Sequence, residues 1–261
     1  MSIRIGCHFA IEDVVAEAEA SGANAAQVFL ADPQKWKVGE VAYPGGNEAL
    51  KADAKAANLE LFVHSPYIMN IPSLNNKVRI PSRTLLKATI SGAAKIGAKG
   101  VIVHGGHIKD DEDIVQGFVN WRKAIDEVDP KVDILIENTA GGQNAMAREL
   151  SHIEWLWQAV SSSPNAAHVG FALDTCHAWA AGLDLATIVS DLKAITGRID
   201  VVHLNDSRDA AGSGADRHAP LGKGKIPEEL LLHVVKEAKA PVIIETHGDP
   251  TEEISWLKDR L

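Results

Sequence analysis

The sequence predicts an α/β fold, a (β/α)8 barrel of the TIM type in a single domain. Short apolar, β-rich runs alternate with longer helical patterns along the whole chain, which is the order of a parallel barrel. Runs such as 101–103 and 134–136 are apolar on successive residues, as expected of strands buried on both faces of a parallel sheet. The length of 261 residues suits such a barrel.

The expected elements follow one another in order. Strands are expected at 3–7, 25–30, 59–64, 100–104, 132–137, 168–174, 199–204 and 240–245. Helices are expected at 11–20, 47–57, 82–96, 111–127, 147–160, 184–195, 227–238 and 251–260. The first helix ends at Ser21-Gly22, a common stop signal. No linker or composition break divides the chain, so residues 1–261 are assigned to one domain.

Three segments that follow strands are unusually long. They cover residues 31–46, 65–80 and 206–226 and contain prolines or glycines. Long loops in a compact barrel are usually functional. All three would leave the carboxyl ends of their strands, so this face of the barrel is where we expect the functional site.

Nine residues of the types that bind metal lie where an expected strand stops or in the segments that follow strands. They are His64, His104, Glu137, Asp174, His177, His203, Asp216, His218 and Glu245. The ends of successive parallel strands converge on one point in a closed barrel, so these residues are predicted to form one cluster. Imidazole and carboxylate are standard zinc ligands.

The spacing within the nine suggests how they divide. Asp174 and His177 bracket a single turn after a strand and can face adjacent metals. Asp216 and His218 fall on the same side of an extended loop, because extended chains repeat every second residue. Glu137 closes a buried strand, where an ionised carboxylate needs a partner. We expect it to bridge two metal ions.

Other histidines have less specific roles. His152 and His233 fall inside helical patterns and are expected at the surface or in packing, and His168 opens a strand at the opposite end of the barrel. His8 and His247 follow strand ends and suit a supporting or phosphate-contacting role.

Two residues near the expected ligands remain open alternatives. His107, three residues past His104, is a substitute ligand, and Cys176 is expected to be a small buried residue although its thiol would suit zinc.

Several segments together resemble the endonuclease IV family of zinc-dependent apurinic/apyrimidinic endonucleases. They are 64–70 (HSPYIMN), 136–141 (IENTAG), 173–182 (LDTCHAWAAG), 203–207 (HLNDS), 216–218 (DRH) and 222–224 (GKG). The resemblance spans most of the chain, from about His64 to Glu245. It implies a TIM barrel of the xylose-isomerase-like type that carries three Zn2+ ions, one of which Mn2+ or Fe2+ could replace.

The resemblance also assigns the ligands. One zinc would be held by His64, His104 and Glu137; the second by Glu137, Asp174, His203 and Glu245; the third by His177, Asp216 and His218. Three divalent ions would raise the formal net charge of −9 to −3 and concentrate the added charge at one mouth. This matters because an acidic chain without metal is a poor general binder of nucleic acid.

The implied activity is DNA repair: hydrolysis of the phosphodiester 5′ to an abasic site, leaving a 3′-hydroxyl, with 3′-phosphatase and 3′-diesterase activities left open. Glu137 and Glu245 are the expected catalytic residues, orienting the attacking hydroxide. The expected partner is double-stranded DNA that contains an abasic site, which costs less to extrude than a paired nucleotide.

Expected DNA contacts come from the long loops. Tyr67 resembles the family residue that wedges into the duplex, and Trp36 is a similar candidate. Positively charged candidates for phosphate contacts are Lys35, Arg217, Lys223 and Lys225.

The chain departs from the family pattern in the DNA-facing loops. The departures are the short loop after His8, Gln34 in place of an arginine, Gly105-Gly106-His107 after His104, and His247 in place of a proline.

Two other functions compete with this one. A sugar isomerase or epimerase of the related barrel group would need only Glu137, Asp174, His203 and Glu245. The additional imidazoles, which favour zinc over magnesium or manganese, argue against it. A non-catalytic binding module would have closed metal sites and no shared carboxylate.

The remaining features indicate a cytoplasmic protein, associated with the nucleoid when it acts on DNA. Cys7 and Cys176 do not make a disulfide framework. The first ten residues lack a basic segment followed by a long apolar stretch, so we expect no signal peptide. No apolar window is long enough for a membrane span. We expect a monomer.

Overall fold

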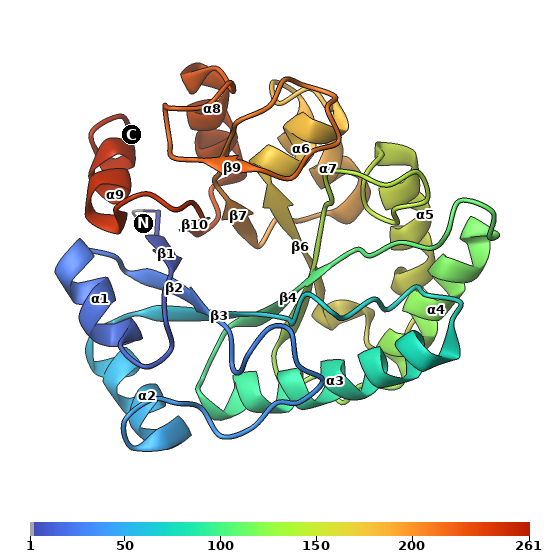
Figure 1. Ribbon diagram of the computed structural model, residues 1–261, viewed down its shortest axis with the longest axis horizontal. Coiled ribbons are helices and arrows are strands. Elements are labelled where there is room, and N and C mark those ends of the chain that lie inside the picture. The colour runs from blue at the N-terminus through green and yellow to red at the C-terminus, as the bar shows by residue number, and fades with distance from the viewer. Residues whose placement is uncertain (1–2) are drawn as a thin grey trace.

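Eight parallel strands close into a barrel in the computed structural model, which describes residues 3–261 (Figure 1). The strands are β1 (Ile5–His8), β2 (Ala25–Val28), β3 (Glu60–His64), β4 (Gly100–His104), β5 (Asp133–Glu137), β6 (Val169–Asp174), β7 (Val201–His203) and β10 (Val242–Ile244). Their order around the barrel is β1-β10-β7-β6-β5-β4-β3-β2. The predicted fold class and all eight predicted strands are confirmed.

Helices surround the barrel on the outside (Figure 1). They are α1 (Val14–Ser21), α2 (Gly46–Ala56), α3 (Asn76–Lys95), α4 (Ile114–Asp126), α5 (Leu150–Ser161), α6 (Thr175–Ala181), α7 (Ile188–Thr196), α8 (Glu228–Ala238) and α9 (Pro250–Lys258). A short 3-10 turn, Ala166–His168, precedes β6. Within residues 3–261, every helix is too short or too polar to cross a membrane.

The structure corrects the predicted elements in three places. First, a helix, α6, directly follows β6, where only a turn was expected; the Asp174 side chain caps it by accepting from the His177 N–H at 2.7 Å. Second, α3 begins at Asn76 rather than at 82, because Asn75 caps it and Pro81 is tolerated inside it. Third, the long segment after β7 contains a small antiparallel pair, β8 (Asp206–Ser207) and β9 (His218–Ala219).

The barrel interior is filled by one apolar side chain from each of seven strands. These form a cluster separate from the main core between barrel and helices: Ala25, Phe62, Ile102, Leu135, Ala172, Val201 and Ile243. Leu135 is large and extends towards two glycines, Gly100 and Gly170. A Cβ at Gly170 would lie 2.7 Å from Leu135 Cδ2, so the glycine makes room for the leucine.

The next inward position on each strand lies two residues further along, because side chains alternate between the faces of a strand. On the same seven strands these positions are Gln27, His64, His104, Glu137, Asp174, His203 and Glu245. The apolar layer is therefore the floor on which a polar layer rests.

We predict that removing part of this floor costs stability. Leu135 is almost fully buried, so Leu135→Ala should lower the free energy of unfolding by about 2–5 kcal/mol. Val115→Ala is the matched control, because Val115 is exposed on α4; it should change stability by less than about 0.5 kcal/mol. Urea denaturation followed by circular dichroism measures both. Equal effects of the two changes would contradict a packed barrel interior.

Candidate metal centre

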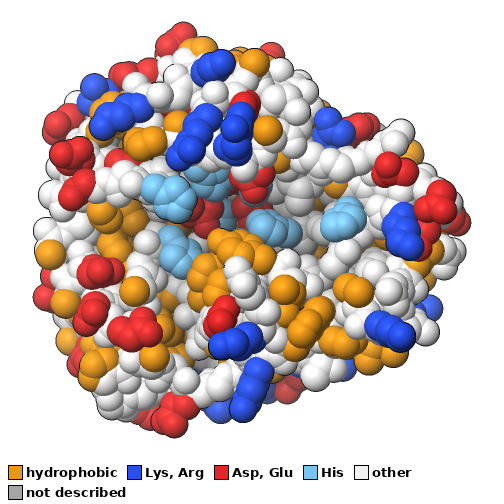
Figure 2. Space-filling model, in the orientation of Figure 1, with side chains coloured by type: hydrophobic (Ala, Val, Ile, Leu, Met, Phe, Trp, Pro, Cys, Tyr) orange, Lys and Arg blue, Asp and Glu red, His pale blue; other side chains and the backbone are white. Residues whose placement is uncertain are grey.

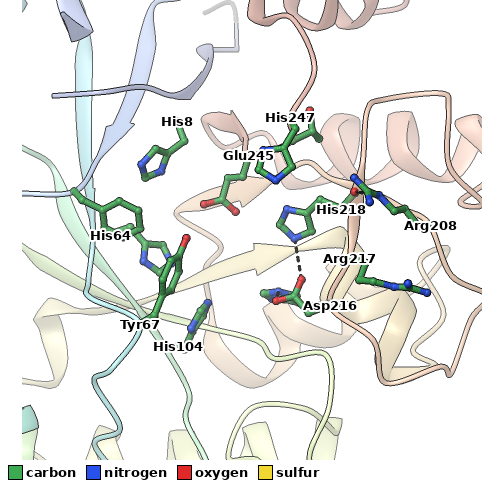
Figure 3. A pocket seen from close by; sticks show the side chains of 13 residues that line it. His8, His64, Tyr67, His104, Arg208, Asp216, Arg217, His218, Glu245 and His247 are labelled. Carbon is green, nitrogen blue, oxygen red and sulfur yellow. Dashed lines mark hydrogen bonds and ion pairs between the residues drawn. The ribbon is translucent and has the colours of Figure 1, made fainter. Parts of the chain in front are cut away.

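A pocket of about 660 Å3 opens at the carboxyl end of the barrel. Figure 2 shows histidine side chains gathered in the hollow at the centre of this face. In Figure 3, His64, Tyr67 and His104 lie on one side of the pocket and Asp216 and His218 on the other. The side chains of the polar layer thus meet the long segments after β3 and β7 in one place.

Glu137 lies at the centre of the cluster and is fully buried. Its Oε2 is 3.3 Å from His64 Nε2 and 3.3 Å from His104 Nε2. Its Oε1 is 2.9 Å from His203 Nδ1. Burial alone would raise the pKa of Glu137, but His203 and His104 outweigh it and hold the pKa well below its usual value. The carboxylate is therefore anionic and faces two groups of imidazoles at once.

A first group of ligand atoms comes from His64, His104 and Glu137, all within 4.8 Å of one another. A second comes from Glu137, Asp174, His203 and Glu245 within the same limit. His203 Nδ1 is 3.0 Å from Glu245 Oε2. The residues that the family resemblance assigns to the first two metal ions thus lie together, and the two sets share Glu137.

The third group is arranged differently from the expectation. Asp216 lies between two imidazoles, with Oδ2 3.1 Å from His177 Nε2 and Oδ1 3.1 Å from His218 Nε2. However, the compact sets of ligand atoms are Asp174, His177 and His218, and separately Cys176, Asp216 and His218. His218 thus faces two carboxylates, those of Asp174 and Asp216, and not only the one that was predicted.

Backbone carbonyls set the proton positions of two imidazoles. His64 Nδ1 is 2.7 Å from the Ser65 carbonyl oxygen, and His177 Nδ1 is 2.9 Å from the Asn138 carbonyl oxygen. A carbonyl oxygen only accepts, so each Nδ1 carries a proton and donates it. In the neutral ring the Nε2 lone pair is then left to face the carboxylates, which is how proteins prepare histidines for metal.

Three amide side chains that sequence reasoning missed support the carboxylates. Asn205 Nδ2 donates to Asp174 Oδ2 at 2.6 Å, and Asn205 Oδ1 accepts the Glu245 N–H at 2.9 Å. The Asn138 amide bonds both main-chain polar groups of Asp174. Gln27 is fully buried and contacts His203 and Glu245. A polar residue inside the apolar run of β2 was the signal that could have revealed Gln27.

The donor set fits metal cations. Glu137 and Asp174 are fully buried carboxylates, and such groups need a cation or several hydrogen bonds to offset desolvation. His218 Nε2 is buried and has no hydrogen-bond partner in the described chain, although Asp216 Oδ1 is close. Nitrogen and carboxylate oxygen are the donors that zinc prefers. The cluster therefore has the chemistry of a site for several metal ions.

Two of the expected DNA contacts belong to the wall of the pocket. Tyr67 is 58% exposed, stacks on His104 with ring centroids 6.1 Å apart, and lines the pocket. Arg217 also lines it but pairs with Asp209.

The other expected DNA contacts lie elsewhere. Lys35, Trp36 and Lys223 are exposed and are not among the residues that line this pocket. Lys35 Nζ pairs with Asp32 at 3.1 Å.

Several residues around the site match or extend the sequence reading. His8 and His247 line the pocket, whereas the His107 side chain is exposed. Cys176 is buried as predicted, and burial raises the pKa of its thiol to about 12. Arg208, which the sequence reading did not single out, also lines the pocket and donates from Nε to the His218 carbonyl at 2.9 Å.

Comparisons with known proteins agree with this arrangement. A family model described as a xylose isomerase-like TIM barrel matches residues 15–260. The probable endonuclease 4 of Mycobacterium ulcerans is 50% identical over 258 residues, covering 98% of each chain. The crystal structure of endonuclease IV from Thermus thermophilus superposes with a TM-score of 0.81 and 31% identity, covering 98% of this chain and 97% of that one. A D-tagatose 3-epimerase-like protein has a TM-score of 0.78 at 20% identity, covers 98% of this chain and 96% of that one, and shares the fold.

We predict that the amide of Asn205 stabilises the metal-free site. Asn205→Leu would leave the buried Asp174 carboxylate and the Glu245 N–H without this partner, at a cost of about 1–3 kcal/mol in unfolding free energy. Urea denaturation in the presence of a chelator measures it, so that bound metal does not contribute. Gln158→Leu on the exposed face of α5 is the control and should be nearly neutral. A neutral effect of Asn205→Leu would show that the hydrogen bonds are replaceable by water.

Proposed function

The chain belongs to the endonuclease IV family of xylose isomerase-like TIM barrels, and from this premise we propose that it is an AP endonuclease of DNA repair. It hydrolyses the phosphodiester bond 5′ to an abasic site in double-stranded DNA and leaves a 3′-hydroxyl. The observation that carries the proposal is the meeting of four overlapping sets of candidate metal-binding side chains at one mouth of the barrel. Identity of 50% over nearly the whole chain to a probable endonuclease 4 supports it.

We assign three zinc ions, one of them replaceable by Mn2+ or Fe2+, to three groups of these side chains. His64, His104 and Glu137 would hold the first; Glu137, Asp174, His203 and Glu245 the second; His177, Asp216 and His218 the third. Bound zinc would supply an activated water at neutral pH and positive charge to neutralise the phosphate.

The protein side chains orient the reactants. Glu137 and Glu245 are the proposed catalytic carboxylates, since both lie beside His203 and can position the attacking water. Arg208 and Arg217 border the pocket on the side of Asp216 and suit contacts with phosphates (Figure 3). Tyr67, exposed above His104, would wedge into the duplex beside the lesion.

The other proposed DNA contacts lie on loops outside the pocket. Trp36, Lys35 and Lys223 are exposed there and would contact the duplex away from the lesion. Such contacts position the DNA without taking part in the reaction.

The isomerase alternative needs only the quartet of Glu137, Asp174, His203 and Glu245. It gives no role to His64, His104 and the third group, which border the same pocket. The likeness to an epimerase-like protein is at 20% identity and concerns the fold. We therefore favour phosphodiester hydrolysis over sugar isomerisation.

The proposal covers the whole chain. Residues 1–261 would act as one endonuclease domain, as a monomer in the cytoplasm. The same metal groups suit 3′-phosphatase and 3′-diesterase activities, because each is a phosphoester hydrolysis at a strand end.

We predict that the zinc-loaded protein nicks a duplex that contains one tetrahydrofuran abasic analogue. Because the imidazoles and carboxylates act through metal, treatment with a strong chelator should abolish measurable cleavage, and added zinc should restore it. Denaturing gel electrophoresis of an end-labelled strand detects the nick and its position. An intact analogue strand after incubation with metal-replete protein would overturn the endonuclease assignment.

We predict that Glu137 is shared between two metal ions. Glu137→Ala should abolish measurable nicking and release more than one equivalent of zinc, because Glu137 belongs to two ligand groups. His107→Ala is the control: its side chain is exposed, so its metal content should equal that of the wild type. Elemental analysis after gel filtration gives the zinc-to-protein ratio. Full metal content in Glu137→Ala would rule out a bridging carboxylate.

A further inference from the structure

Two of the eight strands contribute no assigned metal ligand to the polar layer. β1 ends in His8 and β2 carries Gln27, and these two residues are paired in the register of the adjacent strands. Each of the other six barrel strands contributes a residue assigned to a metal group at or directly after its carboxyl end. The β1–β2 side of the barrel must therefore do something else for the site.

Gln27 is fully buried, yet both ends of its amide are engaged. Gln27 Oε1 is 2.8 Å from His203 Nε2. Gln27 Nε2 is 2.5 Å from Glu245 Oε1 and 2.9 Å from His8 Nδ1. An amide has one acceptor oxygen and two N–H donors, so this geometry uses the oxygen and both hydrogens.

These contacts fix the proton on His203. The Gln27 oxygen can only accept, so His203 Nε2 carries a proton and donates it. In the neutral ring, Nδ1 then has the free lone pair, and Nδ1 is the atom that lies 2.9 Å from Glu137 Oε1 and 3.0 Å from Glu245 Oε2. The reversed amide would place an N–H against His203 and an oxygen against the Glu245 carboxylate, which is repulsive.

The same amide fixes His8. Since Gln27 Nε2 donates to His8 Nδ1, the proton of the neutral His8 ring lies on Nε2. No hydrogen bond in residues 3–261 engages His8 Nε2, and this atom is not among the buried unpaired ones. His8 lines the pocket (Figure 3). Its N–H is therefore available to an acceptor in the pocket, such as a phosphate oxygen of the substrate.

We propose that Gln27 is a positioning residue of the metal site: it holds His203 with Nδ1 directed to the metal, restrains Glu245, and turns His8 into a hydrogen-bond donor toward the substrate. The inference rests on the proposed function, because it needs metal at the group of Glu137, Asp174, His203 and Glu245. Partners of this kind orient ligands, and their loss typically weakens metal binding 10- to 100-fold.

The test compares three zinc-loaded variants in which Gln27 or a distant glutamine is changed. Gln27→Leu removes both halves of the amide. Gln27→Glu keeps an acceptor for His203 but loses the donor groups to Glu245 and His8. Gln158→Leu makes the same change as the first variant at an exposed position on α5, outside the network and away from the pocket, and serves as the matched control.

Two measurements separate positioning from simple loss of stability. Competition with a graded chelator should show metal binding weakened about 10- to 100-fold in Gln27→Leu and unchanged in Gln158→Leu. In 15N-histidine NMR spectra, the wild type should show a slowly exchanging proton on His203 Nε2, which Gln27→Leu should lose. Gln27→Glu should keep this proton but weaken metal binding, because its second oxygen repels the Glu245 carboxylate, and it should raise KM for abasic duplex, because His8 no longer has a fixed Nε2 proton.

The outcomes are distinguishable. Wild-type metal affinity and an unchanged His203 proton in Gln27→Leu would overturn the role of Gln27 while leaving the endonuclease proposal intact. A wild-type protein that takes up one metal ion or fails to nick the duplex would instead overturn the proposed function. If Gln27→Leu does not fold, Gln27→Glu still decides the case: loss of the His203 proton in that variant contradicts the inference.

Discussion

The site depends on the register that points one side chain from each strand toward the barrel axis. Strand residues repeat every second position, so an apolar inward residue is followed two positions later by an inward residue one layer higher. The apolar layer that contains Phe62, Ile102 and Leu135 is thus followed by His64, His104 and Glu137. A shift of a single residue in any of these strands would turn its imidazole or carboxylate outward, toward the helices. The same strand register therefore determines both how the apolar layer packs and how the site assembles.

Burial shifts the pKa values of these side chains and adds a desolvation cost to folding. Glu137 and Asp174 are fully buried, but they respond in opposite directions: burial raises the pKa of Asp174, whereas His203 and His104 reverse the effect of burial at Glu137 and lower its pKa. The ionised form of each of these carboxylates therefore depends on nearby positive charge. Metal ions would supply that charge and also explain why His218 Nε2 is buried without a hydrogen-bond partner in the described chain. The cluster is best understood as a structure completed by cations.

Much of the barrel and the clustering of the candidate ligands were predictable from the sequence, because both follow from where each apolar run ends. His64, His104 and Glu137 could be located in this way, and the structure brings them together. The sequence reading failed where neighbours decide the outcome. Helix α6 depends on Asp174 acting as its cap while also facing the site, and Gln27 in β2 was not identified at all. The role of such a residue depends on partners from distant strands, and local pattern carries no information about them.

The three proposed metal groups are held in position by different parts of the structure. The first two are built from residues at or directly after strand ends, where the barrel ladder fixes the backbone. The third takes His177 from the first turn of α6 and His218 from β9, which pairs only with the two-residue strand β8. Its position relies on loop contacts, among them the Gly214 N–H donating to the Ala180 carbonyl at 2.8 Å and Arg208 donating to the His218 carbonyl. These contacts tie the segment after β7 to α6, so the place of the third group depends on this packing and not on the barrel ladder. The strand ends thus place the first two groups directly, whereas the third reaches the same pocket only because the segment after β7 packs against the helix that follows β6.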